Sequence, residues 1–313
     1  MQKLKGGFIM RNRRDFLKTL SSAGLLLGVS SFPLDALAAE YTKLTILHTN
    51  DVHSRIEPFD GGKYDGLGGA ARRAALVKKI RQEEQHVLLL DCGDIFQGTP
   101  YFNFFSGEVE FRLMNAMGYD AATIGNHDFD GGLAALQQQL KTAKFPMLSS
   151  NYDFSKTLLS NYTKPYHIIE KGPLKIGLFG LGVELDGLVP PKLFGKTVYQ
   201  DPLAKAKETA RLLKVKEKCD FVICLSHLGY TYEDLPNRIS DRNLAGKTSY
   251  IDMILGGHTH TFLDEPQLLQ NENGQAVIVN QVGWAGILLG RIDVYFSKQR
   301  GKRKISSTNI EVR

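Results

Sequence analysis

Five short apolar runs in this chain are each followed at once by side chains that can bind a metal ion. The runs are those that end at residues 47, 90, 124, 225 and 255. The residues that follow them are Asp51 and His53, then Asp94, then Asn126 to Asp130, then His227, and finally His258 and His260. Parallel strands of an open α/β sheet gather ligands beyond their carboxyl ends. We therefore expect these side chains to meet at one edge of a sheet.

The stretch Gly125-Asn126-His127-Asp128-Phe129-Asp130 is the densest of the five. Taken alone it is also typical of a capped turn, because Asn and Asp commonly precede a helix. The other four stretches favour a functional site. Five of the eight histidines lie in these loops. The other three, His48, His86 and His167, lie within or beside strand-like runs, and we predict structural roles for them.

Apolar runs alternate with amphipathic segments along residues 41–297, which predicts an α/β domain. Helices are predicted over residues 69–85, 133–141 and 202–218, and β-hairpins over 167–179 and 267–280. The last predicted strand covers 290–296, and the basic tail 298–304 is expected to be solvated. No internal repeat or domain boundary is visible after residue 40.

Other side chains receive structural interpretations. Phe102, Phe104, Phe105 and Phe111 are predicted to be core, with a platform for a substrate ring as the alternative. Arg72 and Arg73 are predicted to be a solvated helix face, with substrate contact as the alternative. The three cysteines, Cys92, Cys219 and Cys224, have no CxxC spacing and are interpreted as small core residues rather than a disulfide framework.

The net charge of +6 does not indicate a nucleic-acid partner. Residues 1–38 carry six Lys and Arg against two Asp, so the rest of the chain has a net charge of only +2. That segment has a basic start, a short apolar core over 20–32 and a small-residue end, the layout of an export signal. Residues 12–18, NRRDFLK, are typical of a twin-arginine signal. The core is too short for a membrane span, which needs ~20 apolar residues.

These features predict a signal peptide over 1–38, cleaved after Ala38, and a catalytic domain over 39–313. The mature protein is then expected to be periplasmic or otherwise exported, without stable membrane insertion. Translation from Met10 in place of Met1 is an open alternative, because residues 10–14 make a more compact signal opening.

Seven side chains are candidate metal ligands, and none is a thiolate. They are Asp51, His53, Asp94, Asn126, His227, His258 and His260. Such N/O sets suit Zn, Mn, Fe or Co and disfavour a structural zinc. Seven ligands are too many for one catalytic ion with an open position, but they suit two divalent ions ~3.5–4 Å apart that share a carboxylate. Phosphate-ester hydrolysis is the reaction class that most uses such pairs.

The ordered motifs resemble those of the calcineurin-type metallophosphoesterase superfamily. Residues 93–100 (GDIFQGTP), 125–130 and 281–291 are most similar to the catalytic domain of bacterial periplasmic 5′-nucleotidases, UDP-sugar hydrolases and 2′,3′-cyclic phosphodiesterases. The resemblance covers about residues 43–296. It implies a four-layer α/β/β/α sandwich of two mixed sheets. It also implies a hydrolase that cleaves nucleotide phosphate esters by in-line attack of a metal-bridging hydroxide.

The resemblance further implies a role for each residue. Asp51, His53 and His260 would hold the first metal, Asp94 would bridge, and Asn126, His227 and His258 would hold the second. His127 would stabilise the transition state and help to protonate the leaving group, oriented by Asp130. Asp128 stands where the family usually has Glu and is given no catalytic role.

The resemblance does not extend to the family's C-terminal, nucleotide-selecting domain, which nothing after Phe296 could build. The expectation is that a separate polypeptide supplies that half, or that this domain acts alone with broad specificity. Substrate-binding residues are left unassigned. The alternatives within the fold are a cyclic phosphodiesterase, a UDP-sugar hydrolase and a thiosulfohydrolase. A catalytically silent metal- or nucleotide-binding protein is the alternative of another class.

Overall fold

The computed structural model of this chain describes residues 9–10, 41–297 and 303–313. The predicted signal segment, 1–38, therefore lies outside the described residues except for Ile9–Met10. Within the described part of the chain, no helix has the length and apolar character needed to cross a membrane.

The first sheet has eight strands in the order β1-β16-β15-β2-β3-β4-β5-β7. Its strands are β1 (Ile9–Met10), β2 (Tyr41–Thr49), β3 (Val87–Asp91), β4 (Ala121–Thr123), β5 (Met147–Leu148), β7 (Thr163–Lys164), β15 (Leu288–Ser297) and β16 (Arg303–Glu311). β2, β3, β4, β5 and β7 are parallel, whereas β15 is antiparallel to both β2 and β16. The sheet is therefore mixed.

The second sheet has six strands in the order β13-β14-β12-β11-β9-β8 and is also mixed. Its strands are β8 (Tyr166–Lys171), β9 (Leu174–Gly182), β11 (Phe221–His227), β12 (Met253–Gly256), β13 (Gln267–Gln270) and β14 (Ala276–Asn280). The two predicted hairpins are confirmed as the antiparallel pairs β8–β9 and β13–β14. A small third sheet pairs β6 (Tyr152–Asp153) with β10 (Val198–Tyr199).

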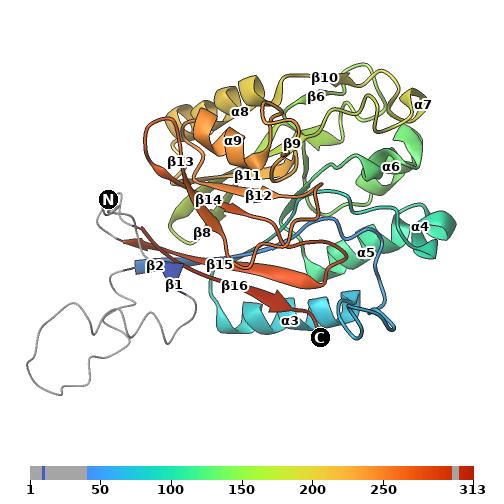
Figure 1. The fold of residues 1–313 in the computed structure, drawn as a ribbon, viewed down its shortest axis with the longest axis horizontal. Coiled ribbons are helices and arrows are strands. Elements are labelled where there is room, and N and C mark those ends of the chain that lie inside the picture. Colours follow the sequence, from blue (N-terminus) through green and yellow to red (C-terminus); the bar gives the residue numbers. More distant parts are fainter. Residues whose placement is uncertain (1–8, 11–40, 298–302) are drawn as a thin grey trace, which may run out of the picture.

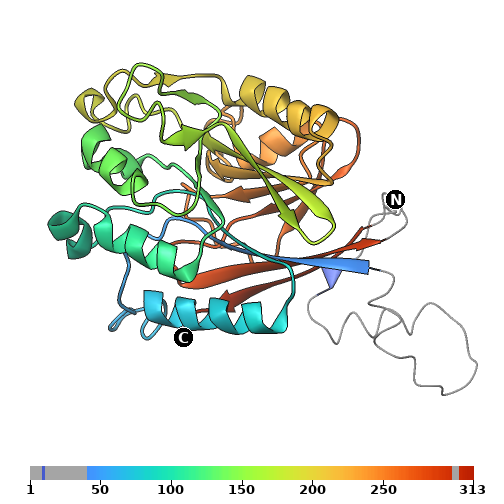
Figure 2. The same ribbon diagram turned by 180° about the vertical axis from the view of Figure 1, so that it is seen from behind.

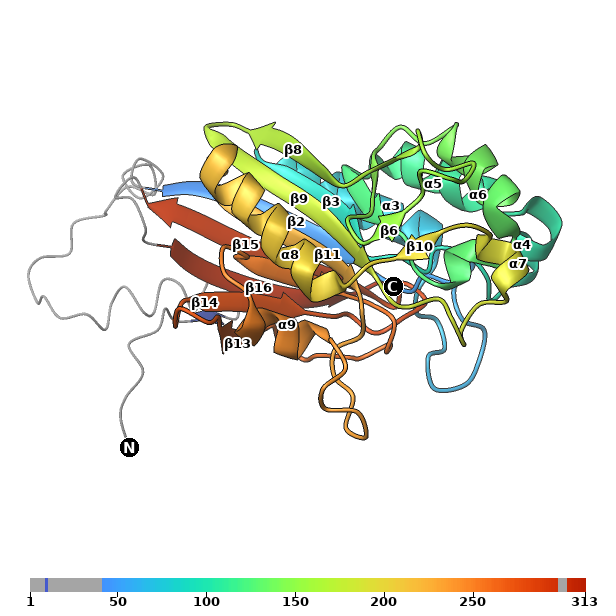
Figure 3. The same cartoon turned by 90° about the horizontal axis from the view of Figure 1, so that it is seen from above.

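Helices cover the outer face of each large sheet, so the predicted four-layer α/β/β/α sandwich is confirmed (Figures 1 and 3). α3 (Ala70–Glu83), α5 (Glu108–Met117) and α6 (Gly132–Leu140) lie on the first sheet, and α8 (Pro202–Arg211) and α9 (Asp241–Lys247) on the second. The view from behind shows α3 (cyan) below the red strands β15 and β16, and α8 (yellow) at the top, above the second sheet (Figure 2). Shorter elements are α4 (Pro100–Phe105), η1 (His127–Phe129), α7 (Pro191–Phe194) and η2 (Leu212–Lys216).

The strand sequences explain the layers. In β2, Leu44 and Ile46 pack in the core between the two sheets, whereas Leu47 packs in the core beneath the helices. In β3, Leu88 and Leu90 likewise pack between the two sheets, whereas Leu89 packs beneath the helices. Successive side chains of a strand point to opposite faces, so a strand buried on both faces is a nearly continuous apolar run. This is why each apolar run was readable as a strand.

Of the predicted solvated basic tail, 298–304, residues 298–302 lie outside the described residues, and the prediction was wrong for the part that the structure describes. Residues from Arg303 onward form β16, which pairs antiparallel with β15 along its length. Arg303 makes an ion pair with Asp252 at 2.7 Å, and Val312 is buried. The segment is polar because it lies near the sheet edge, where only part of each strand contacts the core.

Two further structural predictions need correction. Arg73 is buried, with 3% of its surface exposed, rather than solvated. Of the four phenylalanines predicted to be core, Phe102 and Phe111 are buried, but Phe104 and Phe105 are 80% and 49% exposed. The cysteines are free and buried, as predicted. The predicted helix over 202–218 is α8 followed by the π-helical turn η2.

Candidate metal centre

At or just beyond the carboxyl ends of β2, β3, β4, β11 and β12, the structure brings together the seven predicted ligands. Five of them have a positive φ, a region that residues other than glycine rarely adopt. They are Asp51 (50°), His53 (51°), Asp94 (54°), His258 (75°) and His260 (51°). Such backbone strain costs about 1–3 kcal/mol per residue and persists where the surrounding structure over-determines it. Its concentration here sets this edge apart from ordinary loop structure.

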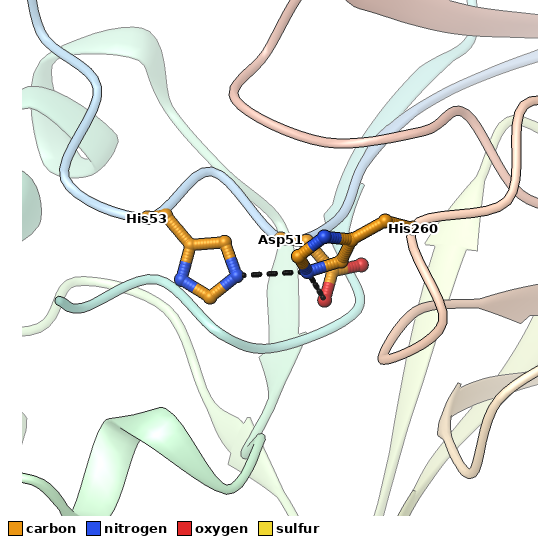
Figure 4. A group of neighbouring side chains, drawn as sticks. All are labelled: Asp51, His53 and His260. Carbon is orange, nitrogen blue, oxygen red and sulfur yellow. Dashed lines mark hydrogen bonds and ion pairs between the residues drawn. The ribbon is translucent and has the colours of Figure 1, made fainter. Parts of the chain in front are cut away.

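One group of potential ligands consists of Asp51, His53 and His260, whose ligand atoms all lie within 4.8 Å of one another. The two imidazoles come from loops far apart in sequence and point toward one another (Figure 4). Nε2 of His53 lies 3.0 Å from Nε2 of His260, which in turn lies 3.4 Å from Oδ1 of Asp51. Nδ1 of His53 faces the carbonyls of Phe96 and Gln97 at 3.2 Å, which orients the ring.

The second group consists of Asp94, His227 and His258, again with ligand atoms within 4.8 Å of one another. Nε2 of His227 lies 3.1 Å from Oδ2 of Asp94. Nδ1 of His227 donates to the carbonyl of Cys92 at 2.7 Å. Asn126 joins this group, because its Oδ1 lies 2.8 Å from Nδ1 of His258. Asp94 also reaches the first group, with Oδ2 at 3.8 Å from Nε2 of His53.

The residues fit a pair of divalent ions. Nε2 of His227 is completely buried, and it lies 3.1 Å from Oδ2 of Asp94 without a well-directed hydrogen bond, an arrangement that a ligand between the two atoms would complete. The close approach of two Nε2 atoms, on His53 and His260, likewise places two potential nitrogen ligands next to one another. The donors are N and O atoms without a thiolate, the set that Zn, Mn, Fe or Co accepts.

The side chains of the second group strongly affect one another's ionisation. Burial of His227 favours its neutral form, but the Asp94 and Asp51 carboxylates outweigh burial and raise its pKa to about 10. Burial likewise opposes ionisation of Asp94, yet His227 and His53 hold the pKa of that carboxyl well below its usual range. Burial and the charge of His227 lower the pKa of His258 to about 4. Asp94 is therefore ionised beside a protonated His227, and a divalent ion bound between them would replace the His227 proton.

His127 and Asp130 lie beside these groups, as a pair. Nδ1 of His127 lies 2.8 Å from Oδ2 of Asp130, and this hydrogen bond raises the pKa of the imidazole. The backbone N–H of His127 donates to Oδ1 of Asp94 at 2.8 Å, which fixes the pair to the centre. The His127 side chain is 39% exposed, so its ring is accessible to a substrate.

Asp128, which was given no role from the sequence, holds two of the loops together. Its carboxylate accepts from four backbone N–H groups: those of Asp94 (3.1 Å), Ile95 (2.9 Å), Phe96 (3.2 Å) and Gly125 (2.8 Å). The side chain is buried. Asp128 therefore positions Asp94 relative to the Gly125–Asp130 loop.

Sequence reasoning also missed two amide side chains that fix the loops. Nδ2 of Asn50 donates to Oδ2 of Asp51 and to the carbonyl of Gly283, both at 2.6 Å. Nε2 of Gln281 donates to the carbonyl of Gly257 at 2.7 Å, and its Oε1 accepts from the backbone N–H of Thr261. Asn50 adjoins a predicted ligand, which is a usable signal. Gln281 is distant in sequence from the loop that it holds, so only the fold reveals it.

Comparison with known proteins identifies similar sequences and folds. A family model for calcineurin-like phosphoesterases matches residues 44–262. The chain is 37% identical to a snake venom 5′-nucleotidase of Crotalus adamanteus over 298 residues, which is 88% of this chain and 49% of the relative. It is 33% identical to a 5′-nucleotidase of Vibrio cholerae, over 94% of this chain and 56% of the relative.

Among solved structures, a 5′-nucleotidase precursor from Thermus thermophilus superposes with a TM-score of 0.76 at 30% identity, over 86% of this chain and 55% of that one. The chain thus spans about half the length of the curated relatives that it matches.

Proposed function

Because this chain belongs to the calcineurin-like phosphoesterase family, we propose that it is a metal-dependent hydrolase of phosphate esters, with nucleotides as substrates. The observation that carries the proposal is the juxtaposition of the two ligand groups at one edge of the sheets, with His127 beside them. Two relatives named 5′-nucleotidase, from Crotalus adamanteus and Vibrio cholerae, support the substrate class.

In this proposal Asp51, His53 and His260 hold one divalent ion, and Asn126, His227 and His258 hold the other, with Asp94 between them. When bound, such ions supply Lewis acidity toward the phosphoryl oxygens and lower the pKa of water. The carbonyl of Cys92 accepts from Nδ1–H of His227, which leaves Nε2 of that ring free as a ligand.

His127 is proposed as the catalytic imidazole. Asp130 accepts from Nδ1–H of His127, so the opposite nitrogen, Nε2, is the one available to the substrate. A protonated His127 places a positive charge where the phosphoryl oxygens gain negative charge, and its Nε2–H can be transferred to the leaving oxygen. The hydrogen bond with Asp130 favours that protonated form.

The test is hydrolysis by the purified protein after loading with Mn or Zn, with the products identified. These are phosphate from AMP or the aryl phosphate, UMP and glucose 1-phosphate from UDP-glucose, a nucleoside monophosphate from cyclic AMP, and sulfate from thiosulfate. AMP, UDP-glucose, 2′,3′-cyclic AMP, thiosulfate and an aryl phosphate would be compared side by side, with chelated protein as the control. Release of phosphate from AMP that disappears on chelation supports the proposal. Selective turnover of UDP-glucose, cyclic AMP or thiosulfate would instead indicate a UDP-sugar hydrolase, a cyclic phosphodiesterase or a thiosulfohydrolase, respectively. No turnover with both metals bound would favour a silent binding protein.

We further propose that residues 1–38 are a twin-arginine export signal and that the mature protein begins at Ala39. Support comes from the basic start, the short apolar core and the small-residue end of this segment. N-terminal sequencing of the protein from its native host tests this. A mature N-terminus at Ala39 is expected, and an uncleaved chain would contradict the proposal.

A separate polypeptide that completes the substrate site is also a proposal. It draws on the expectation from the family resemblance alone. Co-purification of a partner from the native host would support it. A monomer with a micromolar KM for a nucleotide would contradict it.

A further inference from the structure

Four aromatic side chains form a cluster next to the first ligand group. Phe59 and Tyr64 come from the loop between β2 and α3, Phe262 follows the His260 loop, and Trp284 lies between β14 and β15. The ring of Trp284 lies parallel to that of His260, with an interplanar angle of 7° and centroids 5.8 Å apart. The cluster thus begins at a predicted metal ligand and extends away from it.

The rings contact one another in series. Phe59 lies edge-on to Trp284 at 5.8 Å, and Tyr64 lies edge-on to Trp284 at 6.4 Å. Tyr64 and Phe262 are nearly parallel, at 20° and 6.1 Å between centroids. None of the four belongs to any of the hydrophobic cores found in the described part of the chain. Phe262 is 40% exposed, and the other three are partly exposed. Large aromatic groups are usually buried, so this exposure calls for an explanation.

The backbone around Trp284 is tied directly to the metal-site loops. The N–H of Ala285 donates to the carbonyl of Asp51 at 2.7 Å, and that of Gly283 donates to the carbonyl of Thr261 at 2.9 Å. A Cβ at Gly283 would lie 2.2 Å from the ring of Phe262, so only glycine allows that ring to lie against this backbone. The rings are therefore held at a fixed position relative to the ligands, as a specificity site requires.

Basic side chains lie over two rings of the cluster. The guanidinium of Arg55 lies 4.2 Å from the centroid of Phe59, and Nζ of Lys63 lies 5.0 Å from that of Tyr64. The loop also carries acidic groups. Glu57 accepts from the Tyr101 hydroxyl and Asp65 from the backbone N–H of Gly61, whereas Asp60 is exposed.

We propose that Tyr64, Phe262 and Trp284 form the subsite that stacks against the planar ring of the substrate, a nucleobase or an aryl group. The inference rests on the proposed phosphoesterase function and deepens it. With the phosphate at the ligand groups, the rest of a nucleotide extends past His260 to these rings. Stacking accepts any base, because every base has a π-face. This chain then supplies part of the recognition of the ring, and a separate polypeptide would complete it.

The kinetic test compares AMP with ribose 5-phosphate, which has the same phosphate ester but no ring. Tyr64→Ala and Phe262→Ala should each lower kcat/KM for AMP about 5- to 100-fold, mainly through KM, since stacking contributes ~1–3 kcal/mol per base. Ribose 5-phosphate turnover should stay within about twofold of wild type. Tyr64→Phe should retain AMP turnover, because it keeps the ring. Phe104→Ala is the matched control, an exposed aromatic residue outside the cluster.

Trp284 is the single tryptophan of the chain, so its fluorescence reports on this site alone. Titration of chelated protein with adenosine, excited beyond the adenine band, should give a saturable quench that ribose does not produce and that Phe262→Ala weakens. No quench, together with unchanged AMP kinetics in both alanine variants, would overturn the subsite and leave an apolar surface for another protein. Absence of phosphate release from both substrates would instead overturn the proposed function, and the fluorescence titration would still decide the subsite.

Discussion

At the residue scale, the site depends on which nitrogen of each imidazole is already hydrogen-bonded within the protein. Nδ1 of His53 and Nδ1 of His227 each donate a hydrogen bond to a carbonyl oxygen, and Nδ1 of His127 donates to a carboxylate. In each case Nε2 is left for a metal ion or a substrate. The identity of these residues was readable from the sequence, because each follows an apolar run. Their tautomers were not readable, since the partners are backbone groups from other loops.

The first prediction concerns the His127–Asp130 pair. His127→Asn should lower kcat about 10²- to 10⁴-fold, the usual contribution of a general acid or base. The bound metal content should not change, because His127 is outside both ligand groups. Asp130→Asn should lower kcat less. It should also move the alkaline limb of the pH profile to lower pH, because the hydrogen bond from Asp130 raises the pKa of His127. An unmoved limb would show that the pair does not act as proposed.

A second prediction concerns pH and stability. Burial lowers the pKa of His48 to about 3, and its Nε2 accepts from Nδ2 of Asn280 at 2.9 Å. The unfolded chain binds this proton near pH 6.5, whereas the folded chain does not. His48 therefore contributes stability above pH 6.5 that is lost as pH falls from 6.5 toward 3, at about 1.4 kcal/mol per pH unit.

Urea unfolding of wild type and His48→Gln measures this term, since all other titrating groups are common to both. The free energy of unfolding of wild type should fall by about 2 kcal/mol more than that of the variant between pH 6.5 and 5.0. Parallel pH dependences would contradict the assignment of a neutral, buried His48.

At the scale of elements, the strands and hairpins were predictable because their apolar patterns are local. β16 was not, because its residues are polar and only its pairing with β15 makes it a strand. Arg73 was misjudged for a related reason. It lies on a helix of charged appearance, but its guanidinium is buried against Gly286, where a Cβ would lie 2.0 Å from Nη1. Long-range packing decides both cases, and a single sequence does not record it.

The third prediction concerns the link between two site loops. Asp128→Asn places an amide NH₂ where two of four backbone N–H groups now find a carboxylate oxygen. The free energy of unfolding should fall by at least about 2 kcal/mol, because buried donors lose their acceptor. Chemical denaturation measures it. Asp130→Asn is the control. The carboxylate of Asp130 is partly exposed and accepts a hydrogen bond from the His127 side chain rather than from backbone N–H groups. The free energy of unfolding of this variant should therefore differ from that of wild type by less than about 0.5 kcal/mol. Equal losses in both variants would contradict the role assigned to Asp128.

At the scale of the whole molecule, the two sheets bring the carboxyl ends of β2, β3, β4, β11 and β12 to one edge, where the candidate ligands lie. The four-layer fold and the convergence of the seven candidate ligands follow from motif order and the resemblance. Their roles as ligands stay predictions. The aromatic cluster beside His260 was not foreseen, because its members come from three separate segments that no sequence pattern connects.

The fourth prediction is that divalent ions stabilise the folded chain, since they bind a preformed site and thereby favour the native state. The Tm of the metal-loaded protein should exceed that of the chelated protein. The difference should shrink strongly in His227→Gln, which removes a buried ligand. A Phe104→Ala control should keep the full difference, because that side chain is exposed and outside both groups. An undiminished metal effect in His227→Gln would place the ions elsewhere.

One titration tests the central claim most directly. Chelated protein would be titrated with Mn²⁺ at equilibrium, and bound metal and phosphate release from AMP would be measured in the same samples. We predict two ions bound per chain, with phosphate release that rises with occupancy and saturates when both are bound. Two bound ions without release, or release that does not depend on bound metal, would contradict the account.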